Sequence, residues 1–174
     1  MENCLLCQIV AKKIPAKIVF EDEDILGVLD INGAILGHTF VIPKKHFTIM
    51  EQVPHEIISK IFIISNKISK AMFETINIQG TNLFASNGVA AGQMVAHFMV
   101  NVIPRRENDG INLQWEPKKA SEQELLSIQA KLKDGAETPL IEEKKPRKTA
   151  PAQINHTEIP SQENYLFKQI RRIP

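Results

Sequence analysis

The chain has 174 residues, 43% of them hydrophobic and 24% charged, which is enough for one sizeable core with some sequence left for a tail. Its formal net charge of +1 gives no general argument for binding nucleic acid or acidic membranes. The apolar runs are far shorter than the roughly 18 residues that span a bilayer. The N-terminus lacks the basic start and apolar run of a secretory signal. We therefore expect a cytoplasmic protein without a membrane segment.

The N-terminal part of the chain predicts a short helix followed by three strands. Residues 4–12 form the helix, and residues 17–20 and 25–29 form a hairpin around an acidic turn. Residues 38–42 are rich in β-formers and end at Pro43, which has no amide hydrogen to donate to a ladder and so predicts the end of a strand.

The central part predicts one long amphipathic helix over residues 54–76, because apolar residues recur there at positions 57, 61, 64, 68 and 72. Two strands follow, over residues 82–85 and 97–103, on either side of a glycine-rich loop. Strands grouped around one major helix predict an α+β fold with a mostly antiparallel sheet.

The C-terminal part changes in composition. Residues 121–134 predict a helix, with a capping-box pattern at Ser121 and Glu124 and a stop at Gly135. The following stretch is rich in proline and charge and is typical of a linker. We divide the chain into a domain, a C-terminal helix, a flexible linker and a short amphipathic tail, over residues 1–112, 113–135, 136–162 and 163–174.

The tail interleaves aromatic and apolar side chains with Lys168, Arg171 and Arg172. A terminus with such a cluster is expected to dock on another surface. The tail sequence does not identify that surface, which can belong to its own domain, a dimer partner, a different protein or a nucleic acid.

Two groups of residues have the composition of functional sites. Cys4 and Cys7 are two residues apart, a spacing that in a reducing compartment is typical of a metal clip or a redox pair. In a strand over residues 97–103, alternation would place His97, Met99 and Asn101 on one face and core residues on the other. The loop before that strand, residues 87–93, has small residues and amides that can approach a phosphate, although Asn-Gly is also an ordinary turn signal.

The order of these segments resembles the histidine-triad (HIT) family of nucleotide-binding hydrolases and transferases, from residue 4 to about residue 110. The matching segments are Cys4-x-x-Cys7, Ile14-Pro15-Ala16, the hairpin 19–30 with Leu29-Asp30-Ile31, the run 37–46, Ser86-Asn87-Gly88, Ala91-Gly92-Gln93 and residues 97–105. The resemblance implies a HIT-like fold, an antiparallel sheet with one long helix, here extended by a C-terminal helix. It also implies a homodimer formed through the long helix and a strand.

The resemblance also implies a reaction that this sequence is not equipped to perform. In the family, the middle histidine of a His-φ-His-φ-His strand attacks the α-phosphorus of a nucleotide, whereas the row here is His97, Met99 and Asn101. A thioether takes no part in this chemistry, and an amide brings no positive charge. We therefore expect a nucleotide-binding protein with no catalytic residue and without nucleotidyl hydrolase or transferase activity.

Two alternatives remain open. In the first, the protein is an active nucleoside-phosphate hydrolase or transferase with an altered mechanism, in which His38 substitutes for the nucleophile or supports the reaction. In the second, it is a partner-binding scaffold that acts through residues 163–174.

The ligand implied by the resemblance is a purine nucleoside phosphate. Asp30 matches the acid that binds the ribose hydroxyls, Leu29 and Ile31 the apolar wall against the base, and Asn87 and Gln93 the side chains that contact phosphate. The full predicted set is Leu29, Asp30, Ile31, His38, Asn87, Gly92, Gln93, Met99 and Asn101. Taken singly, several of these residues are equally typical of turns or of a core.

The family's zinc-containing members imply a role for His97 as well. With His46 it would complete a Cys₂His₂ set with Cys4 and Cys7, which is a set that zinc prefers. All four positions would be filled by protein, so the site would be structural rather than catalytic. The alternative is a pair of buried thiols beside a solvent-facing His46.

Overall fold

The structure is a computed structural model that describes residues 4–136. The chain divides after Asn112 into two compact units. The predicted tail over residues 163–174 and nearly all of the predicted linker lie outside the described residues.

The first unit is an α+β fold with a five-stranded antiparallel sheet, as predicted. The strands lie in the order β1-β2-β3-β5-β4. The elements are α1 (Leu5–Val10), β1 (Ile18–Glu21), β2 (Ile25–Leu29), β3 (Thr39–Pro43), α2 (His55–Thr75), β4 (Gly80–Phe84) and β5 (Val100–Arg105). Short 3₁₀ turns at Met50–Gln52 and Val89–Ala91 were not predicted.

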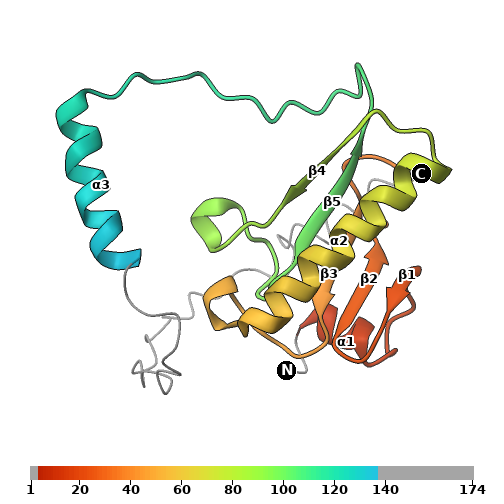
Figure 1. Ribbon diagram of the computed structural model, residues 1–174. Coiled ribbons are helices and arrows are strands. Elements are labelled where there is room, and N and C mark those ends of the chain that lie inside the picture. The colour runs from red at the N-terminus through yellow and green to blue at the C-terminus, as the bar shows by residue number, and fades with distance from the viewer. Residues whose placement is uncertain (1–3, 137–174) are drawn as a thin grey trace, which may run out of the picture. The chain divides into compact units, whose positions relative to one another are not determined.

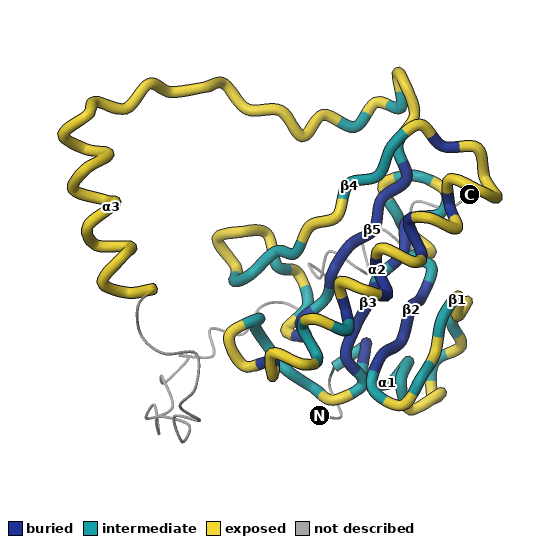
Figure 2. Tube along the Cα trace, in the orientation of Figure 1, coloured by how far each residue is buried: buried dark blue, intermediate teal, exposed yellow. Residues whose placement is uncertain are grey.

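Helix α2 covers one face of the sheet and buries the apolar stripe that predicted it (Figures 1 and 2). Ile61, Ile64, Ile68 and Met72 are buried in one cluster with residues of β2, β3 and β5. A second cluster, on the opposite face of β2 and β3, joins Leu6 of α1 to the sheet. Because strand side chains alternate between faces, β2 and β3 contribute to both clusters.

The predicted end of a strand at Pro43 is confirmed, whereas the predicted start of a strand at residue 97 is wrong. Strand β3 includes Pro43, which pairs with Ile25, whereas the ladder between β3 and β5 already ends at Val41. Pro43 therefore has a strand on one side only, which is where proline is tolerated. Strand β5 begins at Val100 rather than at residue 97, because no strand pairs with the residues just before it in the described part of the chain.

The second unit contains α3 (Glu122–Ala136), which begins with the predicted capping box. The Ser121 hydroxyl and the Glu124 carboxylate exchange hydrogen bonds with each other's backbone amides. The predicted stop at Gly135 is wrong, because this glycine lies inside the helix and lacks the left-handed backbone of a C-cap. Among residues 4–136, none of the helices has the length and hydropathy needed to cross a bilayer.

Candidate functional site

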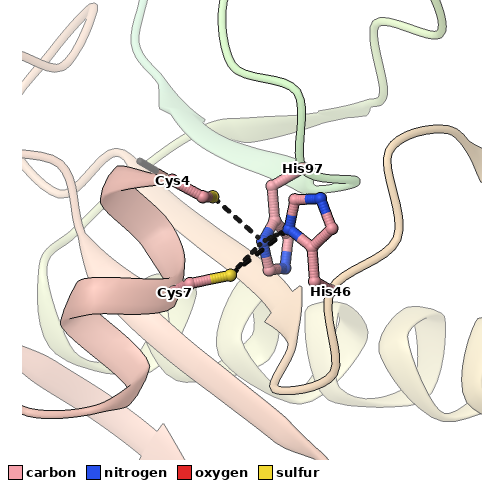
Figure 3. Close-up of side chains that lie close together, drawn as sticks. All are labelled: Cys4, Cys7, His46 and His97. Atoms are coloured by element: carbon pink, nitrogen blue, oxygen red, sulfur yellow. Dashed lines mark hydrogen bonds between the residues drawn. The ribbon is translucent and has the colours of Figure 1, made fainter. Parts of the chain in front are cut away.

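Three segments of the first unit that are far apart in the sequence bring Cys4, Cys7, His46 and His97 together (Figure 3). Cys4 caps the N-terminus of α1, and Cys7 lies in that helix. His46 follows β3, and His97 lies in the bend before β5. The structure thus assembles all four residues that the sequence predicted as metal ligands.

The side-chain donor atoms of this cluster converge on one point. The distance from Nδ1 of His97 to Sγ is 3.5 Å for Cys4 and 3.6 Å for Cys7. The Cys7 sulfur lies 3.3 Å from Nδ1 of His46, and the two Nδ1 atoms are 3.3 Å apart. All four donor atoms lie within 4.8 Å of one another.

These separations match the edges of a tetrahedral zinc site. Zinc bonds of about 2.3 Å to sulfur and about 2.0–2.1 Å to nitrogen require S···N edges of roughly 3.5–3.6 Å and an N···N edge of roughly 3.3–3.4 Å. Three of the four measured separations fall in these ranges, and the Cys7–His46 separation is slightly shorter. The cluster therefore has the composition of a Cys₂His₂ metal-binding group, and four of its six donor separations are close to the tetrahedral values, while the other two lie within 4.8 Å.

The protonation of His97 also suits a metal ligand. Its Nε2 lies 2.9 Å from the Pro43 carbonyl, which can only accept a hydrogen bond, so the proton is on Nε2 and Nδ1 presents a lone pair to the two sulfurs. Burial lowers the pKa of this imidazole and, together with Cys4, raises the pKa of the Cys7 thiol to about 11. A bound cation would offset the cost of placing thiolates here.

The cluster is accessible from one side. Cys7 and His46 line an open cavity of about 330 Å³ together with Lys13, Lys44 and Lys45. His97, by contrast, has none of its surface exposed. An ion can therefore reach the cluster from the side of Cys7 and His46.

A second polar group lies on the sheet between β3 and β5 and joins Asp30, His38 and Asn101. Nε2 of His38 donates to the Asn101 side-chain oxygen at 3.0 Å, and the Asn101 amide donates to the Phe84 carbonyl at 3.3 Å. Nδ1 of His38 accepts from the Ala34 amide at 3.2 Å and lies 3.6 Å from the Asp30 carboxylate. His38 and Asn101 are both buried.

The side-chain amides of Asn87 and Gln93 hold their own loop in place. Asn87 accepts from the Met50 amide and donates to the Glu51 carboxylate, a bond that lowers the pKa of Glu51. Gln93 accepts from the Gly88 amide and donates to the carbonyls of residues 48 and 95. The loop is thereby fixed against residues 48–51. Gly92 has the left-handed backbone that favours glycine.

The remaining predicted residues differ in exposure. Ile31 is 85% exposed, which excludes the reading of this residue as core, and Leu29 is half-buried at the end of β2. Met99 is half-buried against the cluster that contains Leu6 and Ile42. Met99 and Asn101 are thus on the sheet side opposite α2, although Met99 precedes β5.

The chain is similar to known proteins over its first unit. The model of the HIT domain matches residues 11–108, more than half of the chain. The chain belongs to the HIT family. A HIT-like protein of Methanocaldococcus jannaschii is 40% identical over 107 residues, which cover 62% of this chain and 82% of that protein.

Solved HIT structures agree with this assignment. A HIT family protein of Bacillus anthracis superposes with a TM-score of 0.72 at 37% identity, covering 77% of this chain and 97% of that one. A zinc-bound histidine triad family protein of Mycobacterium smegmatis has a TM-score of 0.62 at 34% identity and coverages of 78% and 99%. Among the relatives named for an activity is an adenylylsulfatase of Arabidopsis thaliana, 36% identical over 111 residues, 62% of this chain and 54% of that protein.

Sequence reasoning missed the partners that orient His97 and His38 of this HIT domain. The Pro43 carbonyl fixes the ring of His97, and the Ala34 amide fixes that of His38. Both partners are backbone atoms, which carry no signature in the sequence. The bond between His38 and Asn101 joins residues 63 positions apart and follows from the pairing of Phe40 with Asn101.

Proposed function

We propose that this HIT domain binds a purine nucleoside phosphate without turning it over. The binding surface comprises the nine residues predicted from the sequence, with Asp30, His38 and Asn101 as its polar centre. The observation that carries the proposal is the hydrogen bonding of His38, the one histidine among these nine residues. Both of its ring nitrogens are hydrogen-bonded within the protein, so its lone pair is directed at the Ala34 amide rather than at a ligand.

The nucleophile position itself supports the absence of turnover. Met99 has no ionisable group, and His97 is held in the metal-binding group by contacts with both cysteines. Loss of a nucleophile costs several orders of magnitude in rate, while ligand binding is retained if the remaining contacts are intact. The adenylylsulfatase relative supports an adenylyl-type ligand.

The test combines binding with turnover. AMP and ADP are expected to raise the melting temperature, because a ligand that binds the native state alone stabilises it. Incubation with adenosine 5′-phosphoramidate or diadenosine polyphosphates is expected to give no product and no nucleotidylated protein by mass spectrometry. Turnover that is lost in His38→Ala would overturn the proposal and favour the substitute nucleophile. Failure of millimolar purine nucleotides to shift the melting temperature would favour a scaffold.

We further propose that the Cys₂His₂ group of residues 4, 7, 46 and 97 holds a structural zinc ion. The match of its donor separations to tetrahedral zinc supports this choice, as does the zinc-bound relative of known structure. Zinc would supply no open position for water, so it would tie α1 to the segments around His46 and His97 rather than take part in a reaction.

A homodimer is part of the same proposal. Strand β4 is an edge strand of the sheet and exposes Leu83 and Phe84, while α2 exposes Phe62 and Ile63. Apolar side chains on an edge strand and a neighbouring helix suit a two-fold interface. Light scattering at micromolar concentration is expected to give twice the monomer mass, and a monomer would contradict this part of the proposal.

A further inference from the structure

The polar centre of the proposed nucleotide pocket contains no cationic partner. Within the described residues, the hydrogen bonds and ion pairs of Asp30, His38 and Asn101 involve neither lysine nor arginine. We propose that this pocket recognises the nucleoside and that the phosphate adds little to affinity. The inference rests on the proposed function and specifies which part of the ligand is bound.

The bonding of His38 makes it a neutral imidazole. The Ala34 amide can only donate, so Nδ1 accepts and the single ring proton is on Nε2, where it is given to Asn101. The amide of Asn101 is in turn directed at the Phe84 carbonyl. Neither side chain presents a positive charge to a phosphate, and the second N–H of the Asn101 amide offers only a neutral hydrogen bond, whereas charge-assisted bonds are the strong ones in phosphate recognition.

The loop that would approach the phosphate also uses its donors internally. The amides of Ala91 and Gln93 both donate to the Gly88 carbonyl, and the Gly92 amide donates to the Val89 carbonyl. The Gly88 amide donates to the Gln93 side chain. A phosphate cradle needs several convergent backbone amides, and four of the amides in this loop are already bonded.

Asp30 favours a ribose over a phosphate. One oxygen of its carboxylate accepts from the Asn32 amide, and the other lies 3.6 Å from His38. A carboxylate accepts hydrogen bonds from ribose hydroxyls, whereas it repels a phosphate dianion nearby. The polar centre can therefore bind the ribose hydroxyls, but it contributes no attraction to the phosphate.

The decisive measurement is the ratio of dissociation constants for adenosine and AMP, with guanosine and GMP in parallel, by titration calorimetry on the full chain. We expect the nucleoside and its monophosphate to bind within about threefold of each other. Binding of AMP or GMP more than tenfold tighter than its nucleoside would overturn the inference and leave the proposed function intact. Failure of all four ligands to bind at millimolar concentration would overturn both.

Histidine substitutions provide the second test. The variants Asn101→His and Met99→His/Asn101→His are expected to tighten AMP relative to adenosine by about 10- to 100-fold, the range of a hydrogen bond to a charged group. The matched control, Phe73→His, makes an apolar-to-histidine change on α2, which covers the other face of the sheet, and is expected to leave both constants unchanged. A double variant that keeps the wild-type melting temperature and the wild-type ratio would contradict the inference.

Salt dependence tests the same claim without any substitution. The AMP dissociation constant of the wild-type chain is expected to stay constant or to fall when salt is raised from low to molar concentration, because no cationic contact is screened and any repulsion by the Asp30 carboxylate is weakened. A steep loss of AMP affinity at high salt, absent for adenosine, would reveal a cationic phosphate site and refute the inference.

Discussion

Removal of the metal is the perturbation whose size can be worked out most directly. The ion would connect Cys7 to His46 and His97, which are 39 and 90 residues away in the sequence. Cross-links that close such long loops remove much of the freedom of the unfolded chain. At free zinc 100-fold above its dissociation constant, binding to the folded state alone contributes about 2.7 kcal/mol. For a domain of this size, each kcal/mol corresponds to roughly 4–8 °C, so chelation should lower the melting temperature by roughly 10–20 °C.

The assay is thermal unfolding followed by circular dichroism, with zinc-loaded protein, with protein stripped by a chelator, and with stripped protein to which zinc is returned. Metal analysis of the loaded sample should give one zinc per chain. The variant His46→Asn should unfold like the stripped protein, whereas the matched variant His55→Asn, at an exposed position outside the cluster, should not. A shift below about 2 °C in a sample shown to contain one zinc per chain would refute the reasoning that the ion is a structural tie.

Three further outcomes are expected from the fold itself. Ile61→Ala, at a fully buried position of α2, should lower the free energy of unfolding by about 2–5 kcal/mol, measured by denaturant titration. Ser121→Ala removes the cap that bonds to Glu124 and should cost the second unit's helix about 0.5–2 kcal/mol, seen as a lower helical signal; an unchanged spectrum would count against this cap. Arg105 holds the pKa of Asp109 well below its usual value. The ionised Asp109 carboxylate therefore stabilises the folded state above about pH 4, and this stabilisation is lost as the pH falls further. The difference in melting temperature between wild type and Asp109→Asn should accordingly shrink in acid. A difference that is unchanged in acid would show that it does not come from the ion pair.

The elements that were predicted well are those whose signal is local. The stripe from Ile61 to Met72 repeats at helical spacing over several turns, and the hairpin of β1 and β2 joins two short apolar runs through an acidic turn. Each signal is contained within one continuous segment of the chain, so no tertiary contact was needed to interpret it.

The errors arose where distant residues decide the local backbone. The segment before β5 alternates like a strand, yet the Phe98 amide donates to the Phe47 carbonyl at 2.6 Å, and His97 is drawn towards α1 by the cysteines. These contacts direct residues 97–99 away from the ladder. Neither the contact with Phe47 nor those with the cysteines leave a mark in the sequence near residue 97. The end of β3 at Pro43, by contrast, was predicted, because proline has no amide hydrogen to donate to a ladder.

His97 of the metal-binding group and Asn101 of the polar centre are only four residues apart in the sequence, yet separate contacts hold them. His97 is positioned by the cysteines and the Pro43 carbonyl. Asn101 is positioned by its pairing with Phe40 across the β3–β5 ladder, which begins only at Val100. Within the described part of the chain, neither Met99 nor Asn101 has a hydrogen bond to the metal-binding group. Substitutions at these two positions can therefore leave the contacts of His97 with the cysteines intact. If Met99 stands at the nucleophile position, as proposed, this independence accounts for a HIT fold that is retained without the nucleophile.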